Sequence, residues 1–383
     1  MNFELPEELR ILRDTMNDFV DRELIPIELD CVEGPGLKPE YRQQLEAKTK
    51  AMGLWLLDAP AEYGGHEIRM PAQVVIWEAM ARSIAVPARD YGIFGPEVKQ
   101  ILYRLNAEQK ERYMLPLLRG EKKTAFAQTE PDAGSDPSSM RTTAVRQGDH
   151  YVINGYKRFI TNASGADFFQ LVAATDRSKG SRGGLSMFLV DRDTPGLSLV
   201  RKTETMMSAV TWELAFDNMK VPVANLIGQE GEGMGRAQEF LVGNRLRQAC
   251  NGLGAAQRCI ELMTRYAKQR VTFGQPLAER QAVQFMIADS VMEHHAVQLL
   301  IHQTAAKLDA GKAVRHEGYI AKMCGTELGH RVANRCMQIH GGMGLTKELP
   351  IEKMWRSTRA NIITEGPAEV MRMVLARSIL KNY

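Results

Sequence analysis

The chain has 383 residues, of which 44% are apolar and 25% carry a charge. A chain of this length can bury two or three cores, which excludes a small fold that depends on disulfides. Its 49 Lys and Arg nearly balance its 46 Asp and Glu, and the resulting net charge of +3 lacks the basic footprint of a protein dedicated to nucleic acid.

Residues 1–120 have the pattern of a helical domain. Near the start, four apolar residues recur at the three- and four-residue spacings of one helix face: Leu9, Leu12, Met16 and Phe19. Pro6, followed by two glutamates, is typical of the first turn of a helix. The clusters EGPG (33–36) and EYGGHE (62–67) predict turns between helices.

Residues 121–225 change to a β-rich pattern. In HYVINGYKRFIT (150–161), alternating runs flank Asn154-Gly155, a dipeptide favoured in two-residue hairpin turns, so we predict a hairpin that turns there. Three further apolar or alternating runs predict strands: FFQLVAAT (168–175), LSMFLV (185–190) and VTWELAF (210–216). Together these segments predict a compact all-β domain.

Helical periodicity returns in residues 226–383, for example in 281–308 and in a last stretch from about Pro367 to Leu380. The layout predicts an α+β protein with domains at 1–120, 121–225 and 226–383. This order of segments lacks the regular alternation of strands and helices in a doubly wound parallel sheet, which argues against a Rossmann nucleotide site.

Several sequence features argue against other kinds of site. GQEGEGMGR (228–236) lacks the G-x-G-x-x-G spacing, so we expect a flexible connection between domains there. His294, His295 and His302 share a predicted helix without a nearby Cys or carboxylate to complete a ligand set, so we expect no metal site.

The cysteines and the N-terminus predict a cytoplasmic protein. Five cysteines without a C-x-x-C pair suit a reducing compartment. The acidic start MNFELPEELR is unlike a secretory signal, and no apolar stretch approaches the roughly 20 residues of a membrane-spanning helix.

Four signatures occur in a fixed order along the chain. They are TEPDAGSD (129–136) with FITNAS (159–164), RVTFGQPLAERQAVQFMIAD (270–289), QIHGGMG (338–344) and ITEGPAEVMR (363–372). In this order, and with this layout of helices and strands, the chain resembles the acyl-CoA dehydrogenases over essentially its whole length.

The resemblance implies an architecture and a reaction. It implies an N-terminal helical domain, a central β-barrel and a C-terminal four-helix bundle, with FAD bound between domains and across a subunit boundary of a homotetramer. In the family reaction an α-proton and a β-hydride leave an acyl-CoA, a trans-2-enoyl-CoA forms, and the electrons pass to an electron-transfer flavoprotein.

The resemblance identifies Glu365 as the catalytic base, before Gly366 and a final helix. A carboxylate in an apolar pocket holds a proton more tightly than one in water, which suits it to this task. Its backbone N–H is also implied as a donor to the thioester oxygen. The other base position of the family is here Asn244, which cannot accept the proton, and Arg245 matches the active-site arginine. The alternative for Glu365 is a solvated carboxylate at a helix start.

The resemblance also implies contacts with the cofactor. Thr129 and Thr161 match hydroxyls that bond the flavin ring, and Ser135 matches a contact with the pyrophosphate or substrate region. Phe159 stands where many relatives have Trp, so it covers the flavin edge without an indole donor.

Further cofactor contacts lie in the later signatures. Arg270 and Thr272 match residues that hold the FAD pyrophosphate of a neighbouring subunit. The other implied cofactor-binding residues are Phe273, Gln281, Gln338, Gly341, Gly342 and Glu369. The two glycines let the backbone approach a phosphate closely.

The chain departs from the family pattern around Glu365. Pro367 and Glu369 replace Thr and Gln, which could weaken or reshape cofactor binding. Thr364 replaces a frequent Tyr, which could admit a branched, cyclic or bulky acyl group.

Two alternatives to the dehydrogenase remain open. The same fold serves acyl-CoA oxidases and enoyl-CoA reductases, although the chain is too short for the extra C-terminal domain of typical oxidases. The chain could instead be a non-catalytic scaffold that binds flavin or CoA.

Overall fold

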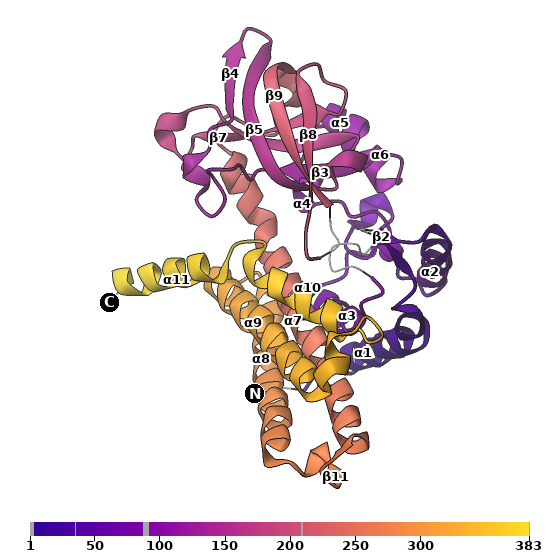
Figure 1. Cartoon of the computed structure of the whole chain (residues 1–383). Helices are drawn as coiled ribbons and strands as arrows, with labels where there is room; N and C mark the ends of the chain where they lie inside the picture. Colours follow the sequence, from indigo (N-terminus) through magenta and orange to yellow (C-terminus); the bar gives the residue numbers. More distant parts are fainter. Residues whose placement is uncertain (1–3, 35, 87–91, 208–209, 383) are drawn as a thin grey trace. The chain divides into compact units, whose positions relative to one another are not determined.

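The computed structural model describes residues 4–34, 36–86, 92–207 and 210–382, except the side chains of 236–241 and 382 (Figure 1). The chain divides into two units. Unit 1 combines Met1–Phe94 with Val242–Tyr383, and unit 2 is Gly95–Leu241.

Unit 1 starts with helices α1 (Glu7–Phe19), α2 (Pro39–Ala51) and α3 (Met70–Met80). The predicted first helix is confirmed: it follows Pro6, and Met16 and Phe19 are buried. The short strands β1 (Val32–Glu33) and β2 (Gly36–Leu37) pair antiparallel, and Gly34 of the EGPG cluster lies in a turn as expected, while Pro35 lies outside the described residues.

Long helices make up the rest of unit 1. They are α7 (Gly233–Gln269), which begins in unit 2, α8 (Gln281–Asp309), α9 (Arg315–His340), α10 (Ile351–Ile363) and α11 (Ala368–Asn382). Strands β10 (Val271–Thr272) and β11 (Gln275–Pro276) form a hairpin between α7 and α8. Helix α9 packs against α8, α10 and α11 (Figure 1). One apolar core joins α7, α8, α9 and α10, as a helical bundle requires.

Two side-chain contacts show the relative direction of α7 and α9 in this bundle. Near the ends of α7 and α9, the rings of Tyr266 and His340 stack with centroids 4.3 Å apart. Nearer their starts, Arg245 lies over Tyr319. The segments of α7 and α9 in unit 1 therefore run parallel, and the bundle has two chemically distinct ends.

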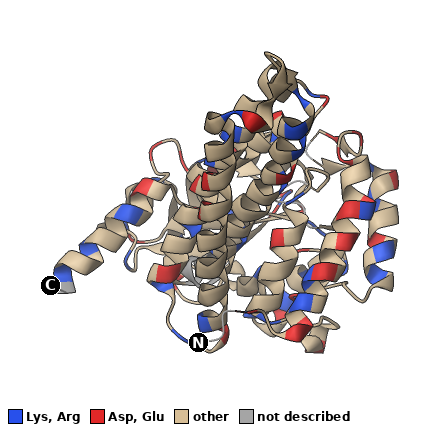
Figure 2. Ribbon diagram, turned by 90° about the horizontal axis from the view of Figure 1, so that it is seen from below, with Lys and Arg blue, Asp and Glu red and all other residues tan. Residues whose placement is uncertain are grey.

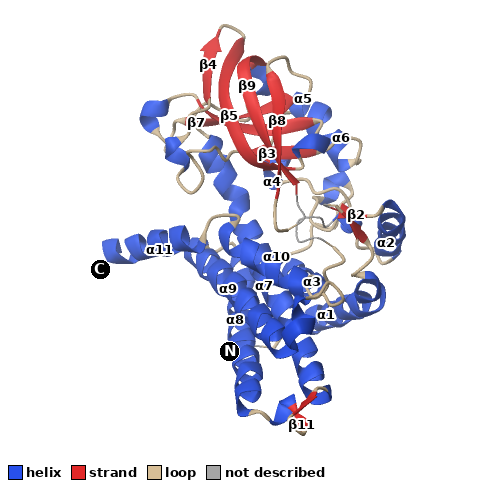
Figure 3. Ribbon diagram, viewed as in Figure 1, coloured by secondary structure: helices blue, strands red, loops and turns tan. Residues whose placement is uncertain are grey.

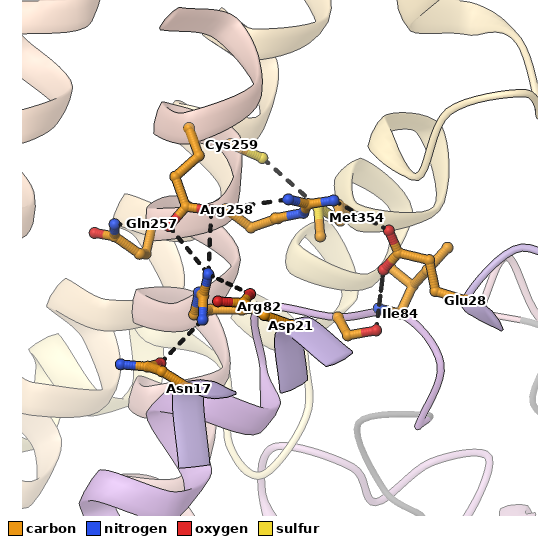
Figure 4. A network of polar contacts seen from close by, with 11 residues as sticks. Asn17, Asp21, Glu28, Arg82, Ile84, Gln257, Arg258, Cys259 and Met354 are labelled. Carbon is orange, nitrogen blue, oxygen red and sulfur yellow. Dashed lines mark hydrogen bonds and ion pairs between the residues drawn. The ribbon is translucent and has the colours of Figure 1, made fainter. Parts of the chain in front are cut away.

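A network of charged side chains fastens the N-terminal segment to α7 (Figure 4). Arg82 donates to Asn17 at 3.0 Å and to Asp21 at 2.9 Å. Arg258, on α7, lies 3.4 Å from the buried carboxylate of Glu28. The network compensates the charges that unit 1 removes from water.

Unit 2 contains a seven-stranded sheet (Figure 3). Its strands are β3 (Thr124–Ala127), β4 (Thr143–Gln147), β5 (His150–Thr161), β6 (Phe168–Ala174), β7 (Leu185–Asp191), β8 (Leu197–Glu204) and β9 (Val210–Pro222). The order is β3-β6-β4-β5-β9-β8, with β7 also paired to β6. The sheet curls around an apolar core as a half-barrel, which confirms the expected β-domain. Three short helices precede it: α4 (Gln100–Tyr103), α5 (Ala107–Gln109) and α6 (Leu115–Leu118).

The predicted hairpin turn at Asn154-Gly155 is wrong. Strand β5 continues through both residues, and the turn lies earlier, where Gln147 pairs with His150. Gly155 has φ 151°, and a Cβ there would lie 2.6 Å from Thr142 Cα. The glycine therefore lies at an irregularity in the β5–β9 pairing, where the backbone of another segment comes close. The local sequence does not distinguish this role from that of a turn residue.

The glycine-rich segment 228–236 differs from the expected flexible connection. Gly231 N donates to Ser186 Oγ at 2.9 Å, and a Cβ on Gly231 would lie 2.5 Å from Gly183 O. Tyr151 also donates a hydrogen bond to Glu230. The glycines here permit close packing against the sheet of unit 2.

Charge, hydropathy and the cysteines add three observations. Acidic and basic residues are both spread over the helices (Figure 2). Within the described ranges, every helix is too short or too polar to cross a membrane. All five cysteines are unpaired thiols.

Candidate active site

Glu365 lies in a tight turn that follows α10. Its φ is 58° and that of Gly366 is 97°, so two consecutive residues adopt left-handed backbone conformations. For a residue with a side chain this conformation costs about 1–3 kcal/mol and persists only where surrounding contacts hold it. The Glu365 side chain is half-buried, so it remains accessible in this turn.

The structure brings Arg245 close to Glu365. Arg245 is buried on α7, and its guanidinium lies 4.6 Å from the centre of the Tyr319 ring. Burial lowers the pKa of Arg245, and the interactions with Tyr319 and Glu365 oppose that shift. The two predicted catalytic residues therefore interact electrostatically within unit 1.

Sequence reasoning missed a third charged group at this turn. Lys322, on α9, has no exposed surface. Its Nζ donates to Ile362 O at 3.0 Å and to Gly366 O at 2.8 Å. The sequence does indicate this lysine, because it stands inside the apolar stretch YIAKMCG (319–325). A lysine with apolar neighbours on both sides is less often exposed to solvent.

In unit 2, the structure brings together three of the predicted flavin contacts. Arg158 N donates to Thr129 O at 2.8 Å, which places Thr129 beside the segment that carries Phe159 and Thr161. Phe159 has φ 58° and is 51% exposed, so the strand presents an aromatic ring to ligands or solvent. Ser135 is exposed on the loop that follows Thr129.

A buried ion pair supports these flavin-signature loops and was also missed. Lys157 Nζ lies 2.7 Å from Glu130 Oε1 and donates to Gln128 O at 2.8 Å. Glu130 also accepts from the backbone N–H groups of Arg141 and Thr142. Burial lowers the pKa of Lys157 to about 8, and Glu130 opposes this shift. Through Lys157, strand β5 is therefore bonded to both neighbours of Thr129, Gln128 and Glu130.

The predicted pyrophosphate residues lie on the hairpin between α7 and α8. Arg270 is exposed, and its guanidinium forms no ion pair with any residue in the described part of the chain. Phe273, at the hairpin turn, is 98% exposed. Arg280 donates to Thr272 O at 2.8 Å, and Gln281 is exposed where α8 begins.

The remaining predicted residues lie at helix ends. Gln338, Gly341 and Gly342 are exposed at the end of α9, and a Cβ on either glycine would meet open space. Glu369 is exposed in the first turn of α11, and the carbonyl of Pro367 accepts a hydrogen bond from Met371 N. These positions present accessible backbone and polar groups at separate ends of unit 1.

The chemistry of these groups fits FAD. An exposed aromatic ring and two threonines on segments joined by a backbone hydrogen bond suit the edge of a flavin. On the hairpin between α7 and α8, the exposed guanidinium of Arg270 and the exposed ring of Phe273 suit a diphosphate and an adenine. Each unit therefore carries groups of the kind that this cofactor needs.

Comparisons with known proteins agree with this chemistry. Three family models match: the acyl-CoA dehydrogenase N-terminal domain over residues 6–121, the middle domain over 125–219 and the C-terminal domain over 231–380. Cyclohex-1-ene-1-carbonyl-CoA dehydrogenase of Geobacter metallireducens is 39% identical, over 98% of this chain and 99% of the relative.

Two further relatives extend the comparison. A subunit of the caffeyl-CoA reductase–Etf complex of Acetobacterium woodii is 35% identical over 98% of this chain and 99% of its own length. The solved structure of butyryl-CoA dehydrogenase from Megasphaera elsdenii has a TM-score of 0.84 and 31% identity, covering 99% of this chain and 100% of the other.

Proposed function

Because the chain belongs to the acyl-CoA dehydrogenase family of FAD-dependent oxidoreductases, we propose that Glu365 is the base that removes the α-proton of an acyl-CoA thioester. The observation that supports this role is the left-handed turn at Glu365, which Arg245 and Lys322 surround with positive charge. A strained, charge-supported carboxylate is costly to keep for structure alone.

The proposed reaction forms one carbon–carbon double bond. The α C–H bond breaks as the Glu365 carboxylate takes the proton, and the β C–H bond breaks as its hydrogen leaves with both electrons. FAD, when bound, supplies the acceptor for that hydride. In unit 2, Thr129, Phe159 and Thr161 would orient the flavin ring. The backbone N–H of Glu365 would donate to the thioester oxygen as negative charge develops there.

The Glu365→Gln variant tests the proposal. It keeps the side-chain shape and removes the base, so anaerobic bleaching of the bound flavin by an acyl-CoA should slow by about a hundredfold to ten-thousandfold. The variant should still bind FAD, measured by its visible spectrum. Glu348→Gln, at an exposed glutamate on a loop, is the matched control and should bleach like the parent. Equal rates in the parent and the Glu365 variant would contradict the proposal.

The acyl group is proposed to be cyclic or otherwise bulky. Thr364 directly precedes Glu365, and its hydroxyl is buried without a hydrogen-bond partner in the described structure. Two relatives at 35% identity or more are named for cyclohexenoyl and caffeyl thioesters. Thr364→Tyr would fill the same space with a ring.

We expect Thr364→Tyr to discriminate between substrates. Turnover of cyclohex-1-ene-1-carbonyl-CoA should fall at least about tenfold, because overpacking excludes the ring, while turnover of butyryl-CoA should change little. Thr364→Ser, which keeps a small side chain at this position, should leave the turnover of both substrates unchanged. An equal loss for both substrates would refute a size-selecting role.

The proposed electron acceptor is an electron-transfer flavoprotein. One relative is named as part of a reductase–Etf complex, which also favours the reverse, enoyl-reducing direction as a second candidate. In that direction Glu365 would return the proton to the α-carbon. Oxygen consumption with an acyl-CoA distinguishes the dehydrogenase and the reductase from an oxidase. Rapid peroxide formation would indicate oxygen as the electron acceptor.

We also propose a homotetramer. Apolar residues seven positions apart on α8 are exposed in the single chain: Phe285, Met292 and Leu299. Residues at this spacing share one helix face, and such a face suits a contact between copies of the chain. Sedimentation of the purified protein, whose chain mass is 42.9 kDa, measures the number of copies.

A further inference from the structure

Lys322 is unusual among the charged groups of unit 1 because it is completely buried without an ion pair. Its helix neighbours Tyr319, Ala321 and Met323 are buried apolar residues. No carboxylate in the described part of the chain lies within ion-pair distance of Nζ, which instead donates to two backbone carbonyls. A buried ammonium costs more than an apolar side chain of the same size, so its retention points to a task that an apolar residue cannot perform.

The two carbonyls bracket Glu365. Ile362 lies in the last turn of α10, where carbonyls lack an intrahelical partner, and a cation there also suits the helix dipole. Gly366 directly follows Glu365. The bonds of 3.0 and 2.8 Å therefore fix the backbone on both sides of the left-handed residue.

The charges around the turn favour the same arrangement. Burial lowers the pKa of Lys322 to about 8, the negative charge of Glu365 opposes this shift, and the positive charge of Arg245 adds to it. The negative charge of Glu365 therefore favours the charged form of Lys322, although the hydrogen bonds from Lys322 go to backbone atoms.

We propose that Lys322 is a positioning residue that clamps the turn of Ile362 to Gly366 and thereby aims both the carboxylate and the backbone N–H of Glu365 at the substrate. This inference rests on the proposed function of Glu365. A base displaced by about 1 Å loses roughly a hundredfold in rate, so removal of the clamp should slow proton removal without abolishing cofactor binding.

The test uses Lys322→Met, which keeps the length of the side chain and removes its charge and its donors. Phenylacetyl-CoA with deuterium at the α-carbon is the probe, because its aromatic β-carbon has no hydrogen to give to the flavin. Loss of deuterium to water, followed by mass spectrometry in the FAD-loaded protein, reports proton removal alone. We expect exchange about a hundredfold slower than in the wild type, with an unchanged flavin spectrum.

Two further variants control for packing and folding. Lys353→Met makes the same change at another lysine of unit 1, whose pKa burial also lowers, and should exchange like the wild type. Lys322→Arg retains donors and charge and should recover the rate to within about tenfold of the wild type. If the methionine variant fails to retain FAD, the arginine variant decides: retained FAD with measurable exchange supports the clamp.

The failures are distinguishable. A wild type that neither exchanges the α-deuterium nor bleaches with any acyl-CoA would overturn the proposed function itself. A wild type that exchanges while Lys322→Met exchanges equally fast would overturn the clamp alone. Loss of fold in both Lys322 variants would assign the lysine to folding and would likewise overturn the clamp.

Discussion

Lys157 and Glu130 are the clearest case in unit 2 of one residue pair that organises a site. Neither side chain contacts solvent appreciably, and together they join Gln128, Arg141 and the strand that carries Phe159. Removal of one member of a buried ion pair leaves the other charge uncompensated, which costs about 3–5 kcal/mol. The pair therefore matters more than any exposed ion pair on the same sheet.

We predict that Lys157→Met lowers the free energy of unfolding by about 3–5 kcal/mol and weakens FAD retention, because Glu130 is left buried without its cation. Urea unfolding of the whole protein at fixed concentration measures the change. On the same sheet, Lys202 and Glu204 form an exposed pair at 3.2 Å, so Lys202→Met should change stability by at most about 0.5 kcal/mol. Similar losses in both variants would contradict the assignment.

At the scale of elements, glycines set the distance between α7 and α9. A Cβ on Gly325 would lie 2.6 Å from Ala249 O, and one on Gly252 would lie 2.0 Å from Gly325 O. The helix backbones therefore touch at this crossing. Because Arg245 lies on α7 and Lys322 on α9, this close approach also brings the charged groups near Glu365 together.

We predict that Gly325→Ala destabilises the protein, although alanine is the better helix former. Helix propensity alone favours alanine by about 0.8–1 kcal/mol, but forcing two backbones apart costs about 1–3 kcal/mol. The control is Gly318→Ala on the same helix, where the nearest atom to the new Cβ is Val242 Cγ1 at 3.6 Å. Thermal unfolding should show a lower midpoint for the first variant and an equal or higher one for the second; a gain in both would refute the contact.

At the scale of the whole molecule, the helical bundle separates the predicted site residues into two sets. Gln338 follows Lys322 by sixteen positions along α9, a separation of about 24 Å. Arg245, Lys322 and Glu365 belong to one end, and the hairpin with Arg270 belongs to the other, next to the stacked Tyr266 and His340. This separation favours an arrangement in which the two sets of residues bind different cofactor molecules in a symmetric oligomer.

We predict that Arg270→Met weakens FAD binding by about tenfold to a hundredfold, because a charge-assisted hydrogen bond contributes about 1.5–3 kcal/mol. Titration of the apoprotein with FAD, followed by flavin fluorescence, measures the dissociation constant. Arg265→Met, at an exposed arginine on α7, is the control and should bind FAD like the parent.

Mixed subunits extend this prediction to the oligomer. If Arg270 serves the cofactor of a neighbouring subunit, Arg270→Met and Glu365→Gln chains that are refolded together should complement each other. Random pairing would restore about a quarter of the sites. Activity no greater than the sum of the separate variants would place both residues on the same cofactor.

The sequence by itself determined the order of helical and β-rich segments and the first helix. Both depend on local periodicity, which records whether each residue faces a core or water. The four signatures identified Glu365, Arg245 and the cofactor residues as candidates, because binding chemistry concentrates in short segments with characteristic side chains.

Only the tertiary structure decided which distant groups meet. It moved the predicted hairpin turn away from Asn154-Gly155, since the contact of Gly155 with Thr142 arises from pairing across the sheet. It also showed that Lys322 reaches Gly366, 44 positions further along the chain, and that Lys157 reaches Glu130 from another segment. Such hydrogen bonds leave no periodic pattern in the sequence, because they depend on how separate elements pack.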